Sequence, residues 1–436
     1  MALGGGKFIA QNKILPGSYI NFVAASRASA IISDRGIVAM PLTMSWGPQG
    51  EVFEVTKDDF VKNSRKIFGY DYTADEMLGM RELFKNAQKG LFFRLGSDAV
   101  CASNEYADAV YPGTRGNDIS FVISKNKDNE ETFDIKTLLA DVVVDIQKAV
   151  TTTADLKSND FVKWKVDVAL TETAKISLAN GTNATTCENY DDFLEKIESR
   201  SFNTLTVADQ NANSVFEDFT ISMREDKGVK IQTVLYKSTA NHEGIISIDN
   251  ELLEKEGVEV DNEMLVYWVA GAEAGCSVNK TLTNRTYDGE LNIYVDYTQK
   301  QLEDALSGGK FLFHRVGDSV RVLEDINTLT KYDDEKNPDF SDNQVIRVLD
   351  QVGNDIAVLF NEHYLGKMPN DESSRIGLWS DIVTHHKQLE SLRAIENFES
   401  EHVTVEKGEG KKSVIVTDIV TPVCAMTKLY MTVVVE

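Results

Sequence analysis

The length and charge of this chain set the first limits on what it does. With 436 residues it exceeds what one hydrophobic core ordinarily supports, so about two to four domains are expected. Its 69 acidic residues outnumber 45 basic ones and give a net charge of −24, which argues against nucleic acid and anionic membranes as partners. No run of about 18 apolar residues occurs, so direct membrane insertion is not expected.

The first 97 residues predict an arm followed by a mixed segment. Residues 1–30 begin with glycines, show no signal-peptide pattern, and carry a strand-like run at 18–24 after the turn signal Pro16-Gly17. Residues 31–97 read as a mixed α/β segment that joins the body. We predict a strand at 37–41 and helices at 57–68 and 73–88, the last with Thr73 and Glu76 as a capping box.

Residues 98–181 predict a small antiparallel β-sandwich. Turn signals such as Pro112-Gly113 and Gly116-Asn117 separate short runs with strand chemistry. The candidate strands are 119–124, 132–138, 142–146 and 162–170. Several short strands at this spacing are typical of a sandwich.

Residues 182–331 alternate strand and helix patterns, which predicts an α/β domain with a mainly parallel sheet. Helices are expected at 190–200, 215–226 and 263–274, and strands at 204–207, 230–236 and 244–248. Thr298 is expected to cap a helix that ends at Gly308-Gly309. A hairpin of residues 310–316 and 319–323 should then turn at Gly317-Asp318.

Residues 332–424 predict a C-terminal α+β domain. Apolar residues at spacings of three and four predict helices at 344–364 and 376–398. A charged turn at 407–412 precedes a predicted strand at 413–418.

The last segment, residues 425–436, reads as a C-terminal strand arm. The run LYMTVVVE is rich in β-branched and aromatic residues and contains no Gly, Pro, Asn or Asp. Such a strand needs partners for its backbone groups and its apolar face. The partner is either a sheet of this chain or a neighbouring subunit that receives the strand by addition.

Signals for catalysis are poor. The six histidines form no HExxH motif, and His385 and His386 are adjacent on a predicted helix, about 100° apart, which argues against a shared metal ion. Residues 408–413 (GEGKKS) resemble a phosphate-binding loop only in part, because Val405 replaces the required upstream glycine and a strand follows. The four cysteines form no CxxC pair and read as reduced, mostly buried thiols. We therefore predict no catalytic, cofactor-binding or metal-ligating residues.

Eight stretches taken together resemble one family, the tail sheath proteins of contractile-tailed phages and of related R-type, diffocin-like bacteriocins of Gram-positive bacteria. The stretches are SDRGIVA (33–39), KIFGY (66–70), YPGTRGN (111–117), EGIIS (243–247), WVAGA (268–272), YDGE (287–290), VLEDINT (322–328) and AMTKLYMTV (425–433). Each motif is weak alone, but their order and spacing run over nearly the whole chain.

The resemblance implies an α+β multidomain fold with a small antiparallel β-sandwich, a non-catalytic subtilisin-like α/β domain, a C-terminal α+β domain, and extended terminal strand arms. No serine protease motif accompanies the subtilisin-like topology, and a fold does not carry an activity with it. The implied function is that of a structural sheath subunit, not an enzyme.

The resemblance also implies the partners. The subunit would polymerise with itself as a helical sleeve, with six subunits expected in each ring, around an inner tail tube protein. Baseplate and tail terminator proteins would bound the sleeve, and contraction would drive the tube through the target envelope. Assembly is expected in the bacterial host cytoplasm, and the product is part of the tail of a released virion, where it serves genome ejection, or of a phage-tail-like particle.

Two sets of residues are expected to make the contacts. The arms that add strands to neighbouring subunits would use Ser18, Tyr19, Ile20, Asn21, Phe22 and Val23 at one end, and Leu429, Tyr430, Met431, Thr432, Val433, Val434 and Val435 at the other. The tube-facing candidates are Arg375, His385, Lys387 and Arg393, because they place positive charge on one predicted helix of an acidic chain. The alternative for that helix is an ordinary amphipathic helix with mixed exposed charge.

Two other classes of protein compete with the sheath interpretation. An α/β hydrolase-type enzyme would be a discrete particle with a pocket. A different self-assembling structural protein, such as a tube or surface-layer protein, would be shorter or exported. Electron microscopy of the purified protein separates these classes, since hollow striated cylinders favour a sheath and discrete particles favour the enzyme.

Overall fold

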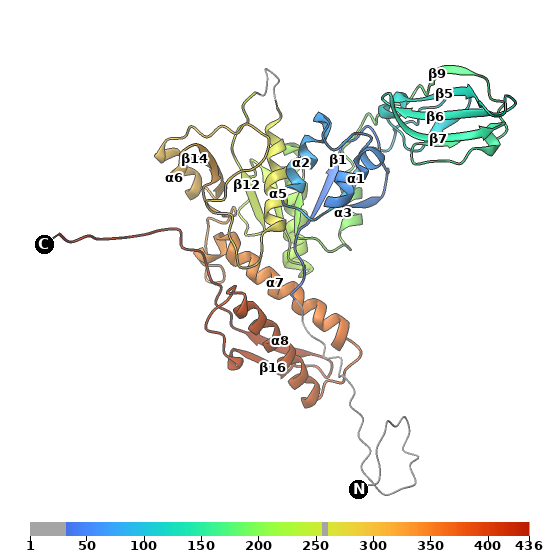
Figure 1. Cartoon of the computed structure of the whole chain (residues 1–436). Helices are drawn as coiled ribbons and strands as arrows, with labels where there is room; N and C mark the ends of the chain where they lie inside the picture. The colour runs from blue at the N-terminus through green and yellow to red at the C-terminus, as the bar shows by residue number, and fades with distance from the viewer. Residues whose placement is uncertain (1–31, 255–259, 436) are drawn as a thin grey trace, which may run out of the picture. The chain divides into compact units, whose positions relative to one another are not determined.

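A computed structural model describes residues 32–254 and 260–435 of the chain (Figure 1). The predicted N-terminal arm strand at 18–23 lies outside these described residues. The fold divides into two compact units. The small unit contains Asp355–Leu389 and Phe398–Val420, and the large unit contains the other described residues from Ser33 to residue 435.

A seven-stranded sheet forms the centre of the large unit, with strand order β13-β12-β11-β10-β1-β3-β2. Its strands are β1 (Ile37–Leu42), β2 (Val52–Thr56), β3 (Lys89–Arg94), β10 (Thr204–Thr206), β11 (Gln232–Tyr236), β12 (Ile245–Ile248) and β13 (Lys310–Phe311). Every neighbouring pair is parallel except β2 with β3. The prediction of a mainly parallel sheet is confirmed. The strands of segment 31–97 belong to this same sheet.

Both faces of the sheet are covered by helices, and β1 shows why. Val38, Met40 and Leu42 point into one core, whereas Ala39 points into the other, because successive side chains of a strand face opposite sides. The first core packs α1 (Lys57–Phe68), α2 (Leu78–Phe84) and α5 (Leu265–Gly275) on the sheet, and the second packs α3 (Tyr190–Ile197) and α4 (Asn213–Ile221).

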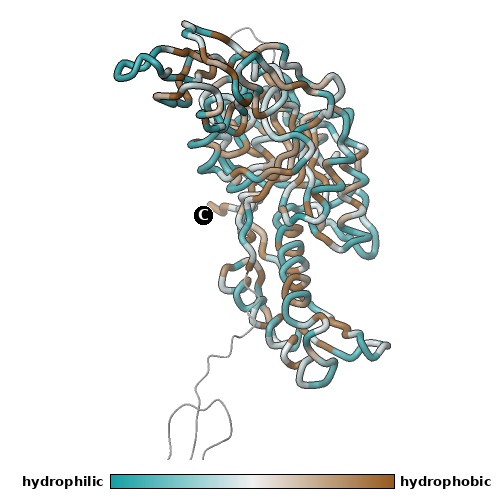
Figure 2. The backbone as a smooth tube through the Cα atoms, turned by 90° about the vertical axis from the view of Figure 1, so that its right-hand side faces the viewer, coloured by the Kyte–Doolittle hydropathy of each residue, from teal (hydrophilic) through white to brown (hydrophobic). Residues whose placement is uncertain are grey.

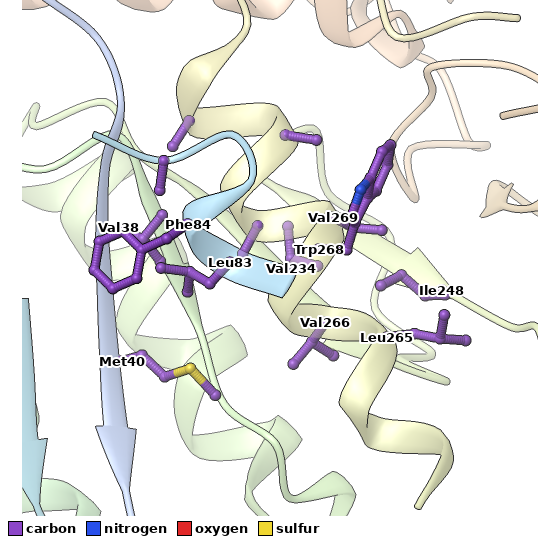
Figure 3. Close-up of a cluster of buried hydrophobic side chains, with 14 of the residues drawn as sticks. Val38, Met40, Leu83, Phe84, Val234, Ile248, Leu265, Val266, Trp268 and Val269 are labelled. Atoms are coloured by element: carbon purple, nitrogen blue, oxygen red, sulfur yellow. The ribbon is translucent and has the colours of Figure 1, made fainter. Parts of the chain in front are cut away.

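Helix α5 is enclosed by protein, and its sequence reflects this. Leu265, Val266, Trp268 and Val269 are fully buried beside Leu83 of α2 (Figure 3). A helix that is apolar all round is stable only where it is enclosed. Gly271 permits this close packing, because a Cβ atom there would lie 2.3 Å from the carbonyl oxygen of Leu83.

The β-sandwich is built from two sheets around a core of its own. One sheet has the order β7-β6-β5-β9, and the other pairs β4 with β8. The strands are β4 (Ala107–Ala109), β5 (Ile119–Lys125), β6 (Phe133–Leu139), β7 (Val142–Val150), β8 (Val162–Trp164) and β9 (Thr173–Ser177). The first three predicted strands are confirmed. The fourth was too long, and β4 and β9 were missed.

The rest of the large unit follows the predicted order closely. Thr298 caps α6 (Gln299–Ser307) in a complete capping box with Gln301. The hairpin β14 (Phe313–Val316) with β15 (Ser319–Val322) turns at Gly317-Asp318, as predicted. Helix α7 (Asn343–Leu359) begins in the large unit and continues into the small one.

The small unit contains the end of α7, a π-helical turn η8 (Phe360–Tyr364), α8 (Glu372–Ser391) as far as Leu389, and the hairpin β16 (Val403–Lys407) with β17 (Val414–Asp418). Its core gathers Leu359, Leu378, Ile382, Val383 and Val403. The remaining short turns of the chain are η1 (Asp75–Met77), η2 (Thr114–Asp118), η3 (Thr153–Asp155), η4 (Gln210–Ala212), η5 (Ser222–Asp226), η6 (Asn262–Met264), η7 (Pro338–Ser341) and η9 (Ser400–His402). None of the described helices is long and apolar enough to cross a membrane.

Several sequence predictions were wrong in detail. Thr73 caps no helix, because the chain enters a 3-10 turn at Asp75 with Ala74 at the cap position and no side-chain bond. Helix α8 ends at Ser391, so the predicted continuation to residue 398 fails. The cysteines are free, but only Cys276 is buried, so the expectation of mostly buried thiols was incorrect.

The contact between α2 and α5 generates a test of the fold. Replacing Gly271 by Ala should lower the free energy of unfolding by about 1–3 kcal/mol, since the new methyl group overlaps the Leu83 carbonyl. Gly353→Ala in α7 is the matched control: its nearest neighbour would be 3.5 Å away, and the gain in helix propensity is the same. Urea unfolding of both variants measures the difference. Equal stability of the two would contradict this description of the core.

Candidate assembly surface

The C-terminal segment is held to the large unit as far as Ala425. The backbone N–H of Glu396 donates to the Thr421 carbonyl at 3.0 Å, and that of Val423 donates to Ala394 at 2.9 Å. The Gln344 side chain of α7 binds two further backbone groups of this segment. It donates to the Val423 carbonyl at 2.9 Å and accepts from the Ala425 N–H at 3.0 Å. A polar side chain of α7 therefore fixes the point at which the chain leaves the body.

Residues 426–435, here called the C-terminal extension, have no strand partner within the described part of the chain. Met426 is 102%, Tyr430 90% and Val435 90% exposed. Figure 2 colours the end of this segment as apolar. A long exposed apolar run with unpaired N–H and C=O groups is rare on a monomeric protein, because a strand of another chain can pair with it. The extension is the most conspicuous candidate for an assembly contact.

Among the described residues, β16 and β17 of the small unit pair only with each other, with Val405 opposite Val416. Within that part of the chain, both outer edges of the hairpin are open. Gly408 donates to Ser413 and Ile419 donates to His402, which sets the alternation of the ladder. By that alternation Val403, Val405 and Lys407 direct their backbone groups away from β17.

A groove of about 500 Å³ runs along the open edge of β16. Its floor and walls come from β16 and from the first turns of α8, including Arg375, Ile376 and Trp379. The Trp379 indole donates to the Val403 carbonyl at 2.9 Å. One outward carbonyl of β16 is thus already satisfied, and residues 403–407 of this strand line the groove. The edge and groove together have the shape and the hydrogen-bonding groups to accept an extended segment.

The four tube-facing candidates differ in their exposure and in the unit to which they belong. Lys387 is exposed on α8, and Arg375 is half-buried and donates to the carbonyl and side-chain oxygens of Asn370. Arg393 lies beyond the end of α8 and belongs to the large unit. His385 is fully buried, which removes it from any set of surface residues. The sequence pattern missed this because α8 is enclosed on more than one side.

His385 and His386 form the centre of a buried polar chain within the small unit. The Nε2 atom of His385 lies 2.9 Å from Asp355, and that of His386 lies 2.7 Å from Asp418. The two Nδ1 atoms are 3.3 Å apart, so the rings meet despite the angle between the two positions on the helix. The chain ties α7, α8 and β17 together and thereby supports the hairpin that offers the open edges.

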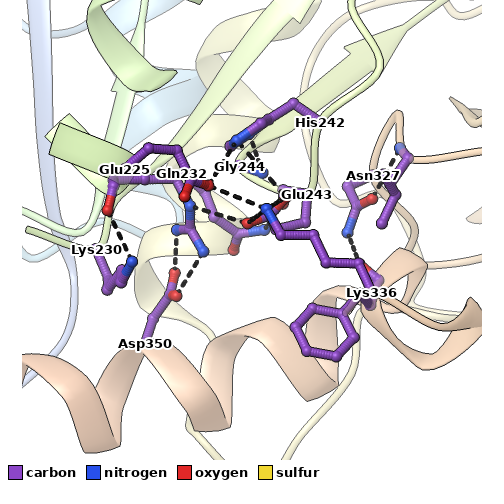
Figure 4. A network of polar contacts seen from close by, with 12 residues as sticks. Glu225, Lys230, Gln232, His242, Glu243, Gly244, Asn327, Lys336 and Asp350 are labelled. Carbon is purple, nitrogen blue, oxygen red and sulfur yellow. Dashed lines mark hydrogen bonds and ion pairs between the residues drawn. The ribbon is translucent and has the colours of Figure 1, made fainter. Parts of the chain in front are cut away.

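A second polar network fastens the first half of α7 to the sheet of the large unit (Figure 4). Arg224 is buried and makes a bidentate pair with Asp350 at 2.7 and 2.8 Å. Lys336 bridges Glu243 at 2.9 Å and Glu225 at 3.0 Å. Burial alone would raise the pKa of Glu243, but His242, Lys336 and Arg224 hold it below its usual value.

Glu225, His242 and Glu243 place ligand-type atoms within 4.8 Å of one another, a spacing compatible with a metal ion. The Lys336 ammonium already contacts both carboxylates. The positive charge that a metal ion would supply is therefore provided by a side chain, and the cluster is best described as an ion-pair network.

A third buried cluster joins α5 to α7 in the large unit. Arg347 contacts Glu273 at 2.6 Å and Asp325 at 3.2 Å, and all three side chains are at most 1% exposed. Burial and the neighbouring Asp325 raise the pKa of Glu273 well above its usual value. Burial alone would also raise the pKa of Asp325, but Arg347 and several hydrogen bonds to its carboxylate hold that pKa below its usual value. The two carboxyl groups that share the Arg347 guanidinium are thus shifted in opposite directions.

Four models of phage tail sheath domains match this chain. The chain matches the phage tail sheath protein central domain over residues 183–328, the sheath C-terminal domain over 335–436, the sheath β-sandwich domain over 96–183, and the N-terminal region of domain III of tail sheath protein Gp18 over 35–95. These four matches follow one another along the chain.

Individual proteins agree with these matches. The phage-like element PBSX protein XkdK of Bacillus subtilis is 31% identical, with 98% of this chain and 99% of XkdK covered. A sheath tail protein from Desulfitobacterium hafniense is 34% identical with a TM-score of 0.82, covering 95% of this chain and 99% of that one. The helical sheath of the anti-feeding prophage in its contracted state shares the fold, at 12% identity and a TM-score of 0.56, over 96% and 99% of the two chains.

The chain belongs to the phage tail sheath protein family. The resemblance seen in the eight sequence stretches is confirmed, and the protein is a multidomain α+β tail sheath subunit with a β-sandwich domain.

The buried network around Arg224 generates a test of how α7 is held. Arg224→Met should lower the free energy of unfolding by roughly 3–5 kcal/mol, because it removes the cation that is paired with the buried Asp350 carboxylate. Lys300→Met, which breaks the exposed pair with Asp304, should change stability little. Thermal unfolding of the isolated subunit compares them. A harmless Arg224→Met change would show that the network does not fasten the helix.

Proposed function

We propose that this subunit polymerises as a helical contractile sleeve around an inner tube and contracts to drive the tube through a target cell envelope. The observation that carries the proposal is the C-terminal extension, pinned at Ala425 and exposed beyond it. Likeness of fold to the contracted sheath of the anti-feeding prophage supports the contractile part. No nucleotide is required, because two packings of the same subunits that differ in buried area supply the free energy.

The links between subunits are terminal strands that add to the β16–β17 hairpin. Residues 429–435 of one copy and the N-terminal run Ser18 to Val23 of another would each occupy one open edge. The outward backbone groups of Val405 and Lys407 would bond one added strand, and the corresponding edge of β17 would bond the other. Each backbone bond contributes roughly 0.5–1.5 kcal/mol net, and the apolar side chains add burial at about 25 cal/mol per Å².

A strand link of this kind suits a sleeve that changes length. The extension leaves the body at one fixed point, so residues 426–428 act as the joint while the added strand stays paired. Bodies then repack without separating. A gain of a few hundred Å² of apolar contact per subunit corresponds to roughly 5–10 kcal/mol, which becomes large when summed over a tail.

The proposal also covers the symmetry of the sleeve, its partners, its place of assembly and the limits of its domains. Subunits would form rings of six, bounded by baseplate and tail terminator proteins, and would assemble in the host cytoplasm of an infectious phage or of a headless bacteriocin. The α/β region would have the topology of subtilisin without its activity, and the chain would divide at about residues 30, 97, 181, 331 and 424. No catalytic residue or cofactor has a role in this mechanism.

Removal of the extension tests the strand link. A chain ending at Ala425 should keep the thermal stability of the intact monomer but form no sheaths, since the deleted residues are exposed and have no strand partner in the described body. The single change Val405→Pro should have the same effect on assembly, because it removes one outward N–H. Thr421→Ser is the control, since it leaves both the anchor and the edge intact. Sheaths of normal length from the truncated chain, seen by electron microscopy, would refute the proposal.

Charge reversal tests the contact with the tube. We expect Lys387→Glu with Arg393→Glu to block sheath growth on tubes at low salt, because an acidic tube would repel the changed surface. Arg375→Glu should add to the effect only if the first turn of α8 also faces the tube. Lys62→Glu with Lys300→Glu, on α1 and α6, makes the same change in net charge at two other exposed positions and serves as the control. Growth at the normal rate with the double variant would remove the tube-facing assignment.

A further inference from the structure

Four titratable side chains of the small unit are joined in series. The Nε2 atom of His385 lies 2.9 Å from Asp355, and the Nε2 atom of His386 lies 2.7 Å from Asp418. Between the rings, the two Nδ1 atoms lie 3.3 Å apart. These four side chains, here called the histidine row, connect α7 through α8 to the end of β17. Both imidazoles are fully buried, so each of the three contacts depends on a proton held within the row.

Two neutral imidazoles cannot supply three protons to the histidine row. A neutral imidazole carries one N–H group and one acceptor nitrogen, and a carboxylate carries no proton. If both N–H groups donate to the carboxylates, the lone pairs of the two Nδ1 atoms face each other. If one N–H group lies at Nδ1 instead, the Nε2 lone pair of that ring faces a carboxylate oxygen. Either arrangement leaves two acceptors in contact in the interior, which is unfavourable.

One additional proton fills every contact of the row. Each Nε2–H group then donates to a carboxylate, and a single Nδ1–H group donates to the other Nδ1 atom. The two rings share one positive charge, which lies between two negative ones. A further proton would break the row again, because two Nδ1–H groups would face each other. The number of bound protons therefore decides whether α7, α8 and β17 stay connected by this route.

The surroundings of His386 and Asp418 supply no substitute for this proton. In the part of the chain that the structure describes, the Oδ1 atom of Asp418 has no hydrogen-bond partner, and no lysine or arginine forms an ion pair with Asp418. The ring of Phe398 lies against His386, with the ring centroids 5.0 Å apart. The next titratable ring, His402, lies 6.2 Å from Phe398 and accepts from the Glu399 N–H. The Asp418 carboxylate thus depends on the Nε2–H group of His386.

The other charged groups near the row are exposed or bonded to other groups. On α8, Lys387 is exposed, and Asp381 accepts from the Tyr364 hydroxyl at 2.5 Å. Strand β16 contributes the apolar side chains of Val403 and Val405 to this core. Among the described residues, the two carboxylates of the row are therefore the charged groups that contact the imidazoles directly.

We propose that the histidine row is a proton-dependent connection between β17 and α8. The connection is complete when the two imidazoles share one extra proton, and it is broken when rising pH removes that proton or when strong acid adds another. Asp418 is the last residue of β17, so the protonation state of the row acts on the strand that offers an open edge. The connection itself does not require a polymer. Only its effect on sheath growth rests on the function proposed above.

Nitrogen-15 NMR of the full-length monomer, labelled at histidine, counts these protons from about pH 5 to about pH 9. We expect a pH range in which the four ring nitrogens of the row carry three protons and a coupling through the hydrogen bond joins the two Nδ1 atoms. At higher pH the coupling should disappear. The amides of β17 should then lose protection against hydrogen exchange, after correction for the intrinsic effect of pH, because the end of the strand is no longer held.

The substitution Asp418→Asn separates the number of protons from a simple loss of charge. The asparagine amide can donate to the Nε2 atom of His386, so two neutral imidazoles then fill all three contacts. This variant should keep both the Nδ1 coupling and the protection of β17 at alkaline pH. Asp381→Asn is the control, since it makes the same change in charge on the same unit but alters only the bond from Tyr364. It should respond to pH as the unchanged chain does.

Two results would overturn the proposal. One is that the rings of the unchanged chain carry only two protons at every pH at which the small unit is folded. The other is that Asp418→Asn loses the protection of β17 with rising pH as the unchanged chain does. If the strand link is correct, sheath growth should also decline at alkaline pH in the unchanged chain but not in Asp418→Asn. Because the protons are counted on the monomer, a failure of this connection is distinct from a failure to polymerise.

Discussion

The backbone of residues 429–435 requires hydrogen-bond partners, and the described part of the chain does not supply them. Exposed apolar strand chemistry of this length is costly to leave in water and easily satisfied by another edge. The hairpin of the small unit has the complementary property, because half of the backbone groups of β16 and β17 point away from their partner strand. Each copy therefore offers both a strand and an edge, and a head-to-tail contact of this kind permits an open polymer.

The buried polar groups explain how such a polymer can move without unfolding. In the large unit, Arg224 with Asp350 and Arg347 with Asp325 fix the beginning of α7 to the sheet. In the small unit, the pair His385 and His386 fixes α8 between α7 and β17. Breaking a buried pair is expensive, so we expect each unit to keep its internal structure. In the proposed mechanism, the energy of contraction would then come from surfaces between subunits.

The sequence predictions that succeeded concern structure that depends on residues close together in the chain. They include the capping box at Thr298, the turn at Gly317-Asp318 and the apolar helix around Trp268. The pairing of Val38 with Thr204 could not be predicted in this way, since the whole sandwich separates these two residues in the chain. His385 shows the same limit at the level of a site. Its burial depends on Asp355 of another helix, so a surface role that its neighbours in α8 suggested was wrong.

Hydrogen exchange at the ends of the chain tests the central claim most directly. Amides of residues 429–435, and the outward N–H of Val405, should exchange rapidly in the monomer and become strongly protected in assembled sheaths, in both the extended and the contracted forms. Amides of the sandwich strand β7 serve as an internal reference. If residues 429–435 exchange as fast in the sheath as in the monomer, the subunits are not joined by these strands and the account is wrong.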